Sequence, residues 1–184
     1  MTASFQAIIF DLDGTLLDSD RALVEAFVRC GVPADQVTFG HVLTDECARF
    51  NIPVQDYIAA YEPSDVQPFP RVEELLAATP RWAVASHKDR DTGLAELKAL
   101  GWQPECAFFT QDFGGAKRLD LVLDTLELAF GDVIFVGDTA HDRRAAHAAK
   151  VPFVAAAWNP RCDIAEGDLV AATPADVLRI VGSM

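Results

Sequence analysis

The fold of this chain is constrained most by a series of apolar runs rich in β-branched and aromatic residues. The runs lack a regular alternation of apolar and polar positions, which indicates strands that are buried on both faces. A parallel sheet covered by helices on both sides buries its strands in this way. The runs occupy residues 5–10, 82–86, 106–110, 133–137 and 151–158.

Helical patterns separate these runs. Apolar residues recur with a period near 3.6 in residues 71–79, 91–101 and 117–130, and residues 142–150 form a short alanine-rich stretch typical of a helix. Gly101 is a suitable C-terminal stop for the second pattern, and the third keeps its period as far as Phe130. Strands that alternate with helices predict an α/β fold, here a Rossmann-like three-layer core with a mainly parallel sheet of five or more strands.

One interval breaks the alternation. Residues 18–67 show no clear strand pattern but carry helical spacings around Phe27, Cys47 and Tyr57. The interval is too long for a simple connection inside a compact domain, and prolines mark the return to the core. We therefore predict a catalytic core from residues 1–17 and 68–184, with a small helical cap, residues 18–67, above the end of the first strand.

Composition limits the class of protein. The chain has 184 residues, of which 51% are apolar, so it can bury a substantial core in one domain with a small insertion. Its 15 basic and 28 acidic residues give a net charge of −13, which disfavours binding to nucleic acid or to anionic membranes. A small anionic substrate remains compatible, because a local cation overrides the global field. We expect a monomer or homodimer.

The cysteines and the N-terminal residues indicate the compartment. The four cysteines show no CxxC or close Cys/His spacing, which is typical of reduced, mostly buried thiols. The first apolar run is short and lacks a preceding basic region, so we expect no secretory signal. No stretch approaches the roughly 20 apolar residues of a membrane span. These features predict a cytoplasmic protein.

Polar residues follow several of the predicted strands. Asp11 and Asp13 end the first strand, Ser86 ends the second, and Asp138 ends the strand at 133–137. In open α/β sheets, ligands bind at the carboxyl ends of the strands. We therefore expect these residues to meet at one rim, together with four others: His87, Lys88, Lys117 and Asp142.

The set fits phosphoryl chemistry on a metal. Carboxylates this close repel one another unless a cation neutralises them, and oxygen-rich sites suit Mg²⁺. A serine hydroxyl and a lysine can hold phosphate oxygens. One carboxylate is then free to attack phosphorus, and a second, two residues on, can protonate the leaving oxygen and later deprotonate water. Gly14 allows a tight turn, and Thr15 can hydrogen-bond the acids.

The segments DLDGTLLDS (11–19) and AVASHK (83–88), followed by Lys117 and GDTAHD (137–142), resemble the four motifs of the haloacid dehalogenase-like hydrolase superfamily, in the same order. The helical stretch after the first motif resembles a C1-type cap. The whole chain resembles the phosphoglycolate-phosphatase-like branch. This resemblance implies a Mg²⁺-dependent phosphatase that acts on a small phosphorylated metabolite through an aspartyl-phosphate.

The resemblance also implies a role for each residue. Asp11 is the nucleophile and Asp13 the general acid/base, with its backbone carbonyl on the metal. The metal set is Asp11, Asp13, Asp138 and Asp142, the last acting directly or through water. The phosphate-binding set is Thr15, Ser86, His87 and Lys117, with His87 contributing a backbone amide in preference to its imidazole.

Alternatives stay open at this point. Lys117 is followed by Arg118 where the family usually has proline, which affects where the helix begins, and Lys88 is a rival for the phosphate-binding lysine. A phosphomutase of the same branch is a second enzymatic reading. A phosphoryl-accepting switch or a non-catalytic binding module is a reading of another class. A dehalogenase is more distant, because its chemistry uses no acid at position 13.

The cap is expected to select the substrate. Its candidate polar residues are Arg21, His41, Asp45, Glu46 and Arg49, although most residues of this kind form solvated helix faces. An anionic substrate would require a cation from the cap, so Arg21 and Arg49 are the first candidates. His141 and His147 are expected on a helix surface.

Overall fold

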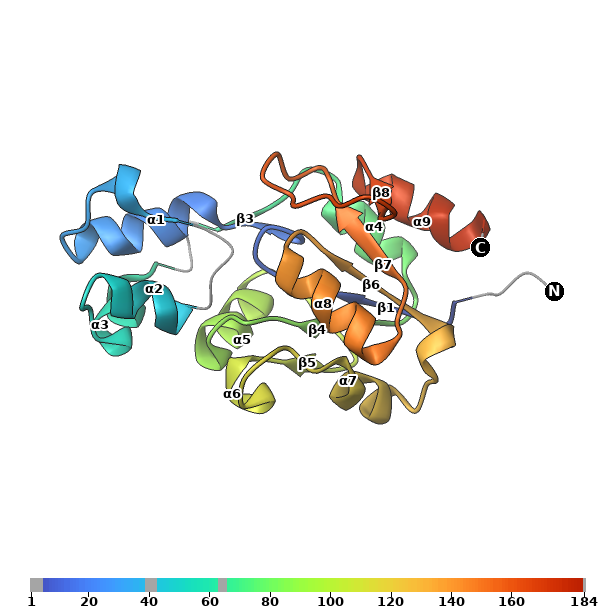
Figure 1. The fold of residues 1–184 in the computed structure, drawn as a ribbon. Coiled ribbons are helices and arrows are strands. Elements are labelled where there is room, and N and C mark those ends of the chain that lie inside the picture. Colours follow the sequence, from blue (N-terminus) through green and yellow to red (C-terminus); the bar gives the residue numbers. More distant parts are fainter. Residues whose placement is uncertain (1–4, 39–42, 63–65, 184) are drawn as a thin grey trace.

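The computed structural model describes residues 5–38, 43–62 and 66–183. Its centre is a six-stranded sheet with the order β5-β4-β1-β6-β7-β8, in which every pair of neighbours is parallel (Figure 1). The strands are β1 (Ala7–Phe10), β4 (Trp82–Ala85), β5 (Ala107–Phe108), β6 (Val133–Gly137), β7 (Phe153–Ala156) and β8 (Leu169–Ala171). The predicted α/β fold with a parallel sheet is thus confirmed.

Helices cover both faces of the sheet. Ile8 and Phe10 of β1 belong to one apolar cluster, which includes side chains from α4, α5 and α9, whereas Ile9 belongs to a second cluster with side chains from α7 and α8. The alternation along β1 therefore produces three layers. The helices are α4 (Val72–Ala78), α5 (Arg90–Ala99), α6 (Thr110–Phe113), α7 (Leu119–Leu126), α8 (Ala140–Ala149) and α9 (Pro174–Ser183), with a short 3₁₀ turn, η3 (Phe130–Asp132).

A small helical unit lies beyond the end of the sheet that carries the carboxyl ends of the strands (Figure 1). It comprises α1 (Asp20–Arg29), η1 (Ala34–Gln36), α2 (Leu43–Arg49) and α3 (Val54–Ala60). Phe27 packs against Phe50 and Tyr57, with ring centroids 5.8 Å and 4.5 Å away. Two-residue strands, β2 (Leu17–Asp18) and β3 (Gln67–Pro68), pair antiparallel where the chain leaves and re-enters the core. The division at residues 18–67 stays a prediction.

Some elements differ from the sequence prediction. The helix expected to reach Phe130 ends at Leu126, because Glu127 adopts a positive φ of 55°, and Phe130 lies 52% exposed in η3. Strands β2, β3 and β8 and helices α6 and α9 were not predicted. Two or three residues are too few to show a period, so short strands of this kind carry little signal in the sequence.

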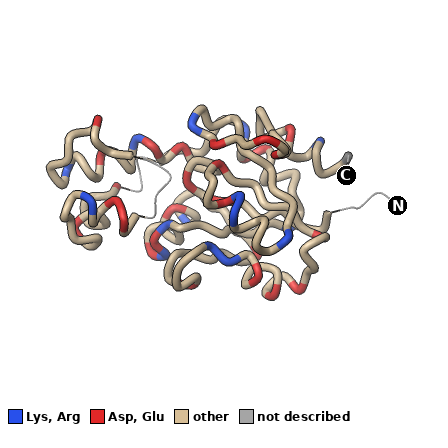
Figure 2. Tube along the Cα trace, in the orientation of Figure 1, with Lys and Arg blue, Asp and Glu red and all other residues tan. Residues whose placement is uncertain are grey.

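The described residues contain no helix that is long and apolar enough to cross a membrane. All four cysteines are free. Figure 2 shows acidic residues distributed over the core and the helical unit, with lysine and arginine in short separate stretches among them.

Candidate active site

The loop after β1 brings the first two acids to the rim of the sheet. The amides of Leu16 and Leu17 both donate to the carbonyl of Leu12, which closes the loop tightly. Gly14 has a φ of +76°, and a Cβ there would lie 2.2 Å from Oδ2 of Asp138. Glycine is therefore needed on two grounds, its left-handed backbone and its close approach to the end of β6.

The first group of side chains at the rim, the Lys117 cluster, consists of Asp11, Lys117, Asp138 and Asp142. One oxygen from each of the three carboxylates lies within 4.8 Å of the others. The Lys117 Nζ atom lies 2.8 Å from Oδ1 of Asp11 and 2.5 Å from Oδ1 of Asp142, and its side chain is 2% exposed. The helix that follows begins only at Leu119, with Arg118 as its N-cap, yet Lys117 still reaches Asp11.

Burial has the largest effect on the pKa values of the Lys117 cluster, and the crowding of negative charge adds to it. Burial raises the pKa of Asp11 to about 7, although Lys117 opposes the effect. Burial and the carboxylates of Asp142 and Asp11 also raise the pKa of Asp138 well above its ordinary range. Burial acts in the same direction on Asp142, but Lys117 and the hydrogen bonds from Thr139 outweigh it, so the pKa of Asp142 is lowered. The Lys117 ammonium is thus the one cation of a cluster of three carboxylates, two of which it contacts.

This donor set fits a divalent cation. Three ionised carboxylates against one ammonium leave two uncompensated negative charges, which a divalent ion would neutralise. All the available ligand atoms are oxygens, and Mg²⁺ prefers oxygen ligands and shares them with phosphate.

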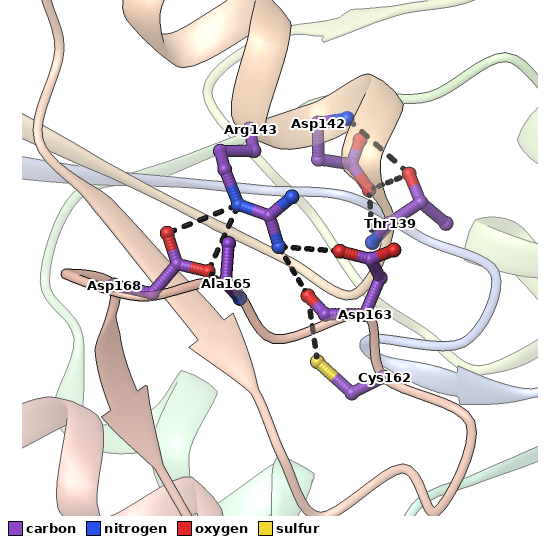
Figure 3. Close-up of polar contacts among 7 residues, drawn as sticks. All are labelled: Thr139, Asp142, Arg143, Cys162, Asp163, Ala165 and Asp168. Carbon is purple, nitrogen blue, oxygen red and sulfur yellow. Dashed lines mark hydrogen bonds and ion pairs between the residues drawn. The ribbon is translucent and has the colours of Figure 1, made fainter.

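Asp142 is held in place by the start of α8. Its carboxylate accepts hydrogen bonds from the amide and hydroxyl of Thr139, and the Thr139 hydroxyl accepts one from the Asp142 amide. Figure 3 shows this capping box beside Arg143, whose guanidinium pairs with Asp168 at 2.8 Å and with Asp163 at 2.7 Å. The amide of Asp163 donates to the carbonyl of Asp138 over 2.8 Å, so the loop after β7 contacts the backbone of Asp138 and the side chain of Arg143, which follows Asp142.

Asn159, which the sequence analysis did not identify, orients Asp138. It is 3% exposed, and its Nδ2 donates to Oδ2 of Asp138 over 2.9 Å and to the carbonyl of Gly14 over 3.0 Å. The hydroxyl of Thr15 donates to the other oxygen of Asp138 over 3.1 Å. The expectation that Thr15 hydrogen-bonds an acid of the site is thus confirmed, and its role toward phosphate stays a prediction. Asn159 follows the apolar run at 151–158, so the strand-end rule, applied once more, would have found it.

The second group, the Lys88 cluster, surrounds the other acid of the β1 loop and consists of Asp13, Tyr61, Lys88 and Glu96. The Lys88 Nζ atom lies 2.7 Å from Oδ1 of Asp13, 3.0 Å from Oε1 of Glu96 and 3.1 Å from the hydroxyl of Tyr61. Burial lowers the pKa of Lys88, but the two carboxylates outweigh this and raise it overall. Lys88 thus pairs with Asp13 and Glu96, whereas Lys117 pairs with Asp11 and Asp142.

Ser86 and His87 lie between the two clusters. Ser86 is 2% exposed, and its Oγ accepts a hydrogen bond from the amide of Lys88 over 3.3 Å. The His87 ring lies 3.3 Å from the carbonyl of Gly115, and burial together with nearby Lys117 lowers its pKa to about 4, so the ring is neutral. His147 is exposed as expected, but His141 is half-buried and packs edge-on against His87, so the prediction of a surface position for it was wrong.

A cavity of about 480 Å³ joins the two clusters to the helical unit. Its wall on the side of the helical unit is mostly apolar and is formed by Leu23, Phe27, Val37, Leu43, Tyr57 and Ile58. Ser19 and Glu46 also line the cavity, and the Ser19 hydroxyl has no hydrogen-bond partner within the described chain.

The two cap arginines that were the first candidates for substrate contact do not line this cavity. The Arg21 side chain is 84% exposed and pairs with Glu25, while Arg49 pairs with Glu46 at 2.6 Å and lies over the Phe50 ring. Asp45 is exposed, and His41 lies outside the described residues. The sequence could not decide between these candidates, because helical spacing does not reveal which polar side chains have a partner within the helical unit.

The fold and the rim of acids together define a class of enzyme. The profile of the haloacid dehalogenase-like hydrolase family matches residues 5–150. The chain therefore belongs to this family.

The chain is also similar in sequence to proteins of one branch of this family. The chain is 30% identical to a phosphoglycolate phosphatase of Xanthomonas campestris pv. campestris strain 8004, over 85% of each chain, and 28% identical to one of Xylella fastidiosa strain Temecula1, over 85% of this chain and 82% of that one. A solved structure of CbbY from Rhodobacter sphaeroides in complex with phosphate is 21% identical and superimposes with a TM-score of 0.72, over 94% of this chain and 96% of the other. These relatives place the chain in the phosphoglycolate-phosphatase-like branch.

Proposed function

We propose that this protein is a Mg²⁺-dependent phosphatase that hydrolyses a small phosphorylated metabolite through an aspartyl-phosphate on Asp11. The observation that carries the proposal is the pairing at the end of β1. Asp11 and Asp13 border one cavity, and each carboxylate contacts its own buried lysine. The helical unit, residues 18–67, would act as the cap over this cavity, and residues 1–17 and 68–184 as the catalytic core.

The first chemical step transfers the phosphoryl group to the enzyme. A carboxylate oxygen of Asp11 attacks phosphorus, and the bond from phosphorus to the leaving oxygen breaks. Asp13 donates its proton to that oxygen, so the product leaves as a neutral alcohol. Lys117 and Ser86 hold the remaining phosphoryl oxygens, and the backbone amide of His87 adds a further donor.

The second step returns the enzyme to its starting state. Asp13, now ionised, accepts a proton from a water molecule, whose oxygen attacks phosphorus. The bond between phosphorus and Asp11 breaks, and inorganic phosphate is released. Asp13 thus ends the cycle protonated, as it began.

The metal would be held by the carboxylates of Asp11, Asp138 and Asp142 together with the backbone carbonyl of Asp13. When bound, Mg²⁺ supplies positive charge that offsets the negative charge of the phosphoryl group. Thr15 and Asn159 orient the Asp138 carboxylate toward this position, since each donates to a different oxygen of that side chain.

The first compound to test is 2-phosphoglycolate, because the similar Xanthomonas and Xylella proteins are phosphoglycolate phosphatases. The panel should include phosphate esters with uncharged alkyl and aryl groups, which suit the apolar wall of the cavity better than a carboxylate does. We expect release of inorganic phosphate that depends on Mg²⁺ and stops on addition of a chelator.

Two other results of these assays would indicate a different function. Formation of an isomeric phosphate ester without release of inorganic phosphate would indicate a phosphomutase. A stable acyl phosphate after incubation with acetyl phosphate, with no turnover of any ester, would indicate a phosphoryl-accepting switch.

A further inference from the structure

The Lys88 cluster joins Asp13 to three buried polar side chains. These side chains come from both the core and the helical unit. Lys88 follows β4, Glu96 lies on α5, and Tyr61 directly follows α3. We propose that Lys88, Glu96 and Tyr61 are positioning residues that orient the Asp13 carboxyl toward the leaving oxygen and link this orientation to the cap. The inference rests on the proposed phosphatase function.

Lys88 is fully engaged by the cluster. Its side chain is 5% exposed, and its three N–H donors match three acceptors, namely Asp13, Glu96 and the Tyr61 hydroxyl. The ammonium also lies 4.9 Å from the centroid of the Tyr61 ring. A lysine with no donor left cannot bind a phosphoryl oxygen without breaking one of these contacts. Its function is therefore exerted on Asp13.

Glu96 is buried at a cost that packing alone does not explain. Its side chain is 1% exposed, and its Oε2 atom has no hydrogen-bond partner among the described residues. Apolar residues of similar volume often stabilise a core at least as well as a buried ion pair does. Glu96 gives Lys88 a second buried carboxylate partner, 3.0 Å away, so the ammonium is held between two acids.

Tyr61 joins this ion pair to the helical unit. Its hydroxyl donates to Oε1 of Glu96 over 2.6 Å and accepts from Lys88 over 3.1 Å. The residue is 6% exposed and lies where the chain leaves α3 on its way back to the core. A displacement of the helical unit would move this hydroxyl relative to Lys88, so the position of the cap affects the contact that holds Asp13.

The contact with Lys88 has a direct consequence for catalysis. Lys88 holds Oδ1 of Asp13, so Oδ2 is the oxygen left to carry the proton. Proton transfer to a leaving group requires the donor within hydrogen-bond reach in the correct orientation. Loss of Lys88 would leave Asp13 in place but free to rotate.

The test uses the dependence of rate on the leaving group. An alkyl phosphate needs protonation of its leaving oxygen, whereas p-nitrophenyl phosphate releases a stable phenolate and needs little help. We expect Lys88→Met to lower kcat/KM for hexyl phosphate by ~100-fold and for p-nitrophenyl phosphate by less than ~5-fold. Lys98→Met, on the exposed side of α5, is the matched control and should change neither value.

A double mutant tests whether Lys88 acts through Asp13. In the Asp13→Asn background, Lys88→Met should cause no further loss toward hexyl phosphate, because residues that act as a unit are not additive. A full additional loss would mean that Lys88 acts elsewhere, and it would overturn the inference.

Two conservative variants guard against misfolding of Lys88→Met. Tyr61→Phe removes only a hydroxyl and should lower activity toward hexyl phosphate by about 5-fold while sparing p-nitrophenyl phosphate. Thr125→Val removes a hydroxyl from the exposed side of α7, outside the cavity, where it contacts the carbonyl of Leu121, and should change neither. Glu96→Gln should behave as Tyr61→Phe does. Equal losses toward both substrates in folded variants would overturn the inference and leave the phosphatase function intact, whereas a parent enzyme that releases no phosphate would overturn both.

Discussion

The two buried lysines of the site make similar contacts and differ in what surrounds them. Lys117 and Lys88 each bridge one acid of the β1 loop to a second buried carboxylate, Asp142 in one case and Glu96 in the other. The Lys117 cluster contains a third carboxylate, Asp138, and no residue of the helical unit, whereas the Lys88 cluster contains the Tyr61 hydroxyl from that unit.

This difference indicates that the two lysines have different roles in the proposed function. Under the proposed function, the three carboxylates around Lys117 leave negative charge that a divalent ion would neutralise, and Lys117 would hold a phosphoryl oxygen. Around Lys88, two carboxylates and a hydroxyl use every donor, so the ammonium fixes geometry and is not available for binding. Variants of each cluster should therefore fail in different ways.

Asp11→Asn should have the largest effect, because it removes the proposed nucleophile. We expect kcat to fall by at least ~10⁴-fold for every phosphate ester, with the far-ultraviolet circular dichroism unchanged. Phosphate release is the measurement, in saturating Mg²⁺. Residual turnover near the level of the parent would exclude the covalent mechanism and remove the functional contrast between the clusters.

Lys117→Met should have the next largest effect, and it should not depend on the leaving group. Removing an electrostatic contact to the transferred group typically costs 10²–10³-fold in kcat, so we expect a loss of ~10³-fold toward hexyl phosphate and p-nitrophenyl phosphate alike. Side-by-side kinetics on these two esters compare Lys117 with Lys88 directly. A loss confined to hexyl phosphate would show that the two lysines share one task.

Asn159→Ala should affect metal binding more than chemistry. Asn159 donates to Asp138 and to the carbonyl of Gly14, so its loss would free the Asp138 carboxylate to rotate. Residues that orient metal ligands typically contribute 10–100-fold to affinity, and we expect the Mg²⁺ concentration for half-maximal activity to rise by about 10-fold. Asn51→Ala, in the helical unit, is the control. An unchanged Mg²⁺ requirement would place the metal away from Asp138.

Much of the core could be predicted from the sequence because its signals are local. Strands β1, β4, β6 and β7 are apolar on both faces, and their carboxyl ends carry Asp11, Ser86 and Asp138. The loop after the apolar run at 106–110 placed Lys117 at the same rim, but the choice of Lys117 over Lys88 for the phosphate depended on the family resemblance, since nothing local shows that its side chain turns back toward Asp11. Prediction therefore worked where a residue's environment is set by its own strand.

The Lys88 cluster could not be predicted in this way. Glu96 lies between Ala95 and Leu97 in a helix with many polar residues, which is typical of a solvated face. Its burial depends on Tyr61, which arrives from the helical unit 35 residues earlier in the chain. Such contacts arise from tertiary packing and leave no period in the sequence.

The smallest effect we predict concerns stability and pH at Glu96. The groups facing its carboxylate are Lys88, Asp13 and Tyr61, and burial raises its pKa from 4.5 to about 7. The fold therefore favours protonated Glu96, and this stabilisation is lost as pH rises from about 4.5 through 7. Glutamine stays neutral throughout, so the free energy of unfolding of Glu96→Gln relative to the parent should rise by about 2 kcal/mol between pH 5 and pH 8.

Urea denaturation at the two pH values measures this difference. Glu105→Gln is the control with the opposite sign, because Arg81 lowers the pKa of the exposed Glu105 and its ion pair contributes at high pH. A difference between Glu96→Gln and the parent that does not change with pH would mean that Glu96 is ionised throughout. Glu96 would then be a stronger competitor for the Lys88 ammonium, and the contact between Lys88 and Asp13 would be weaker than in a cluster with a neutral Glu96.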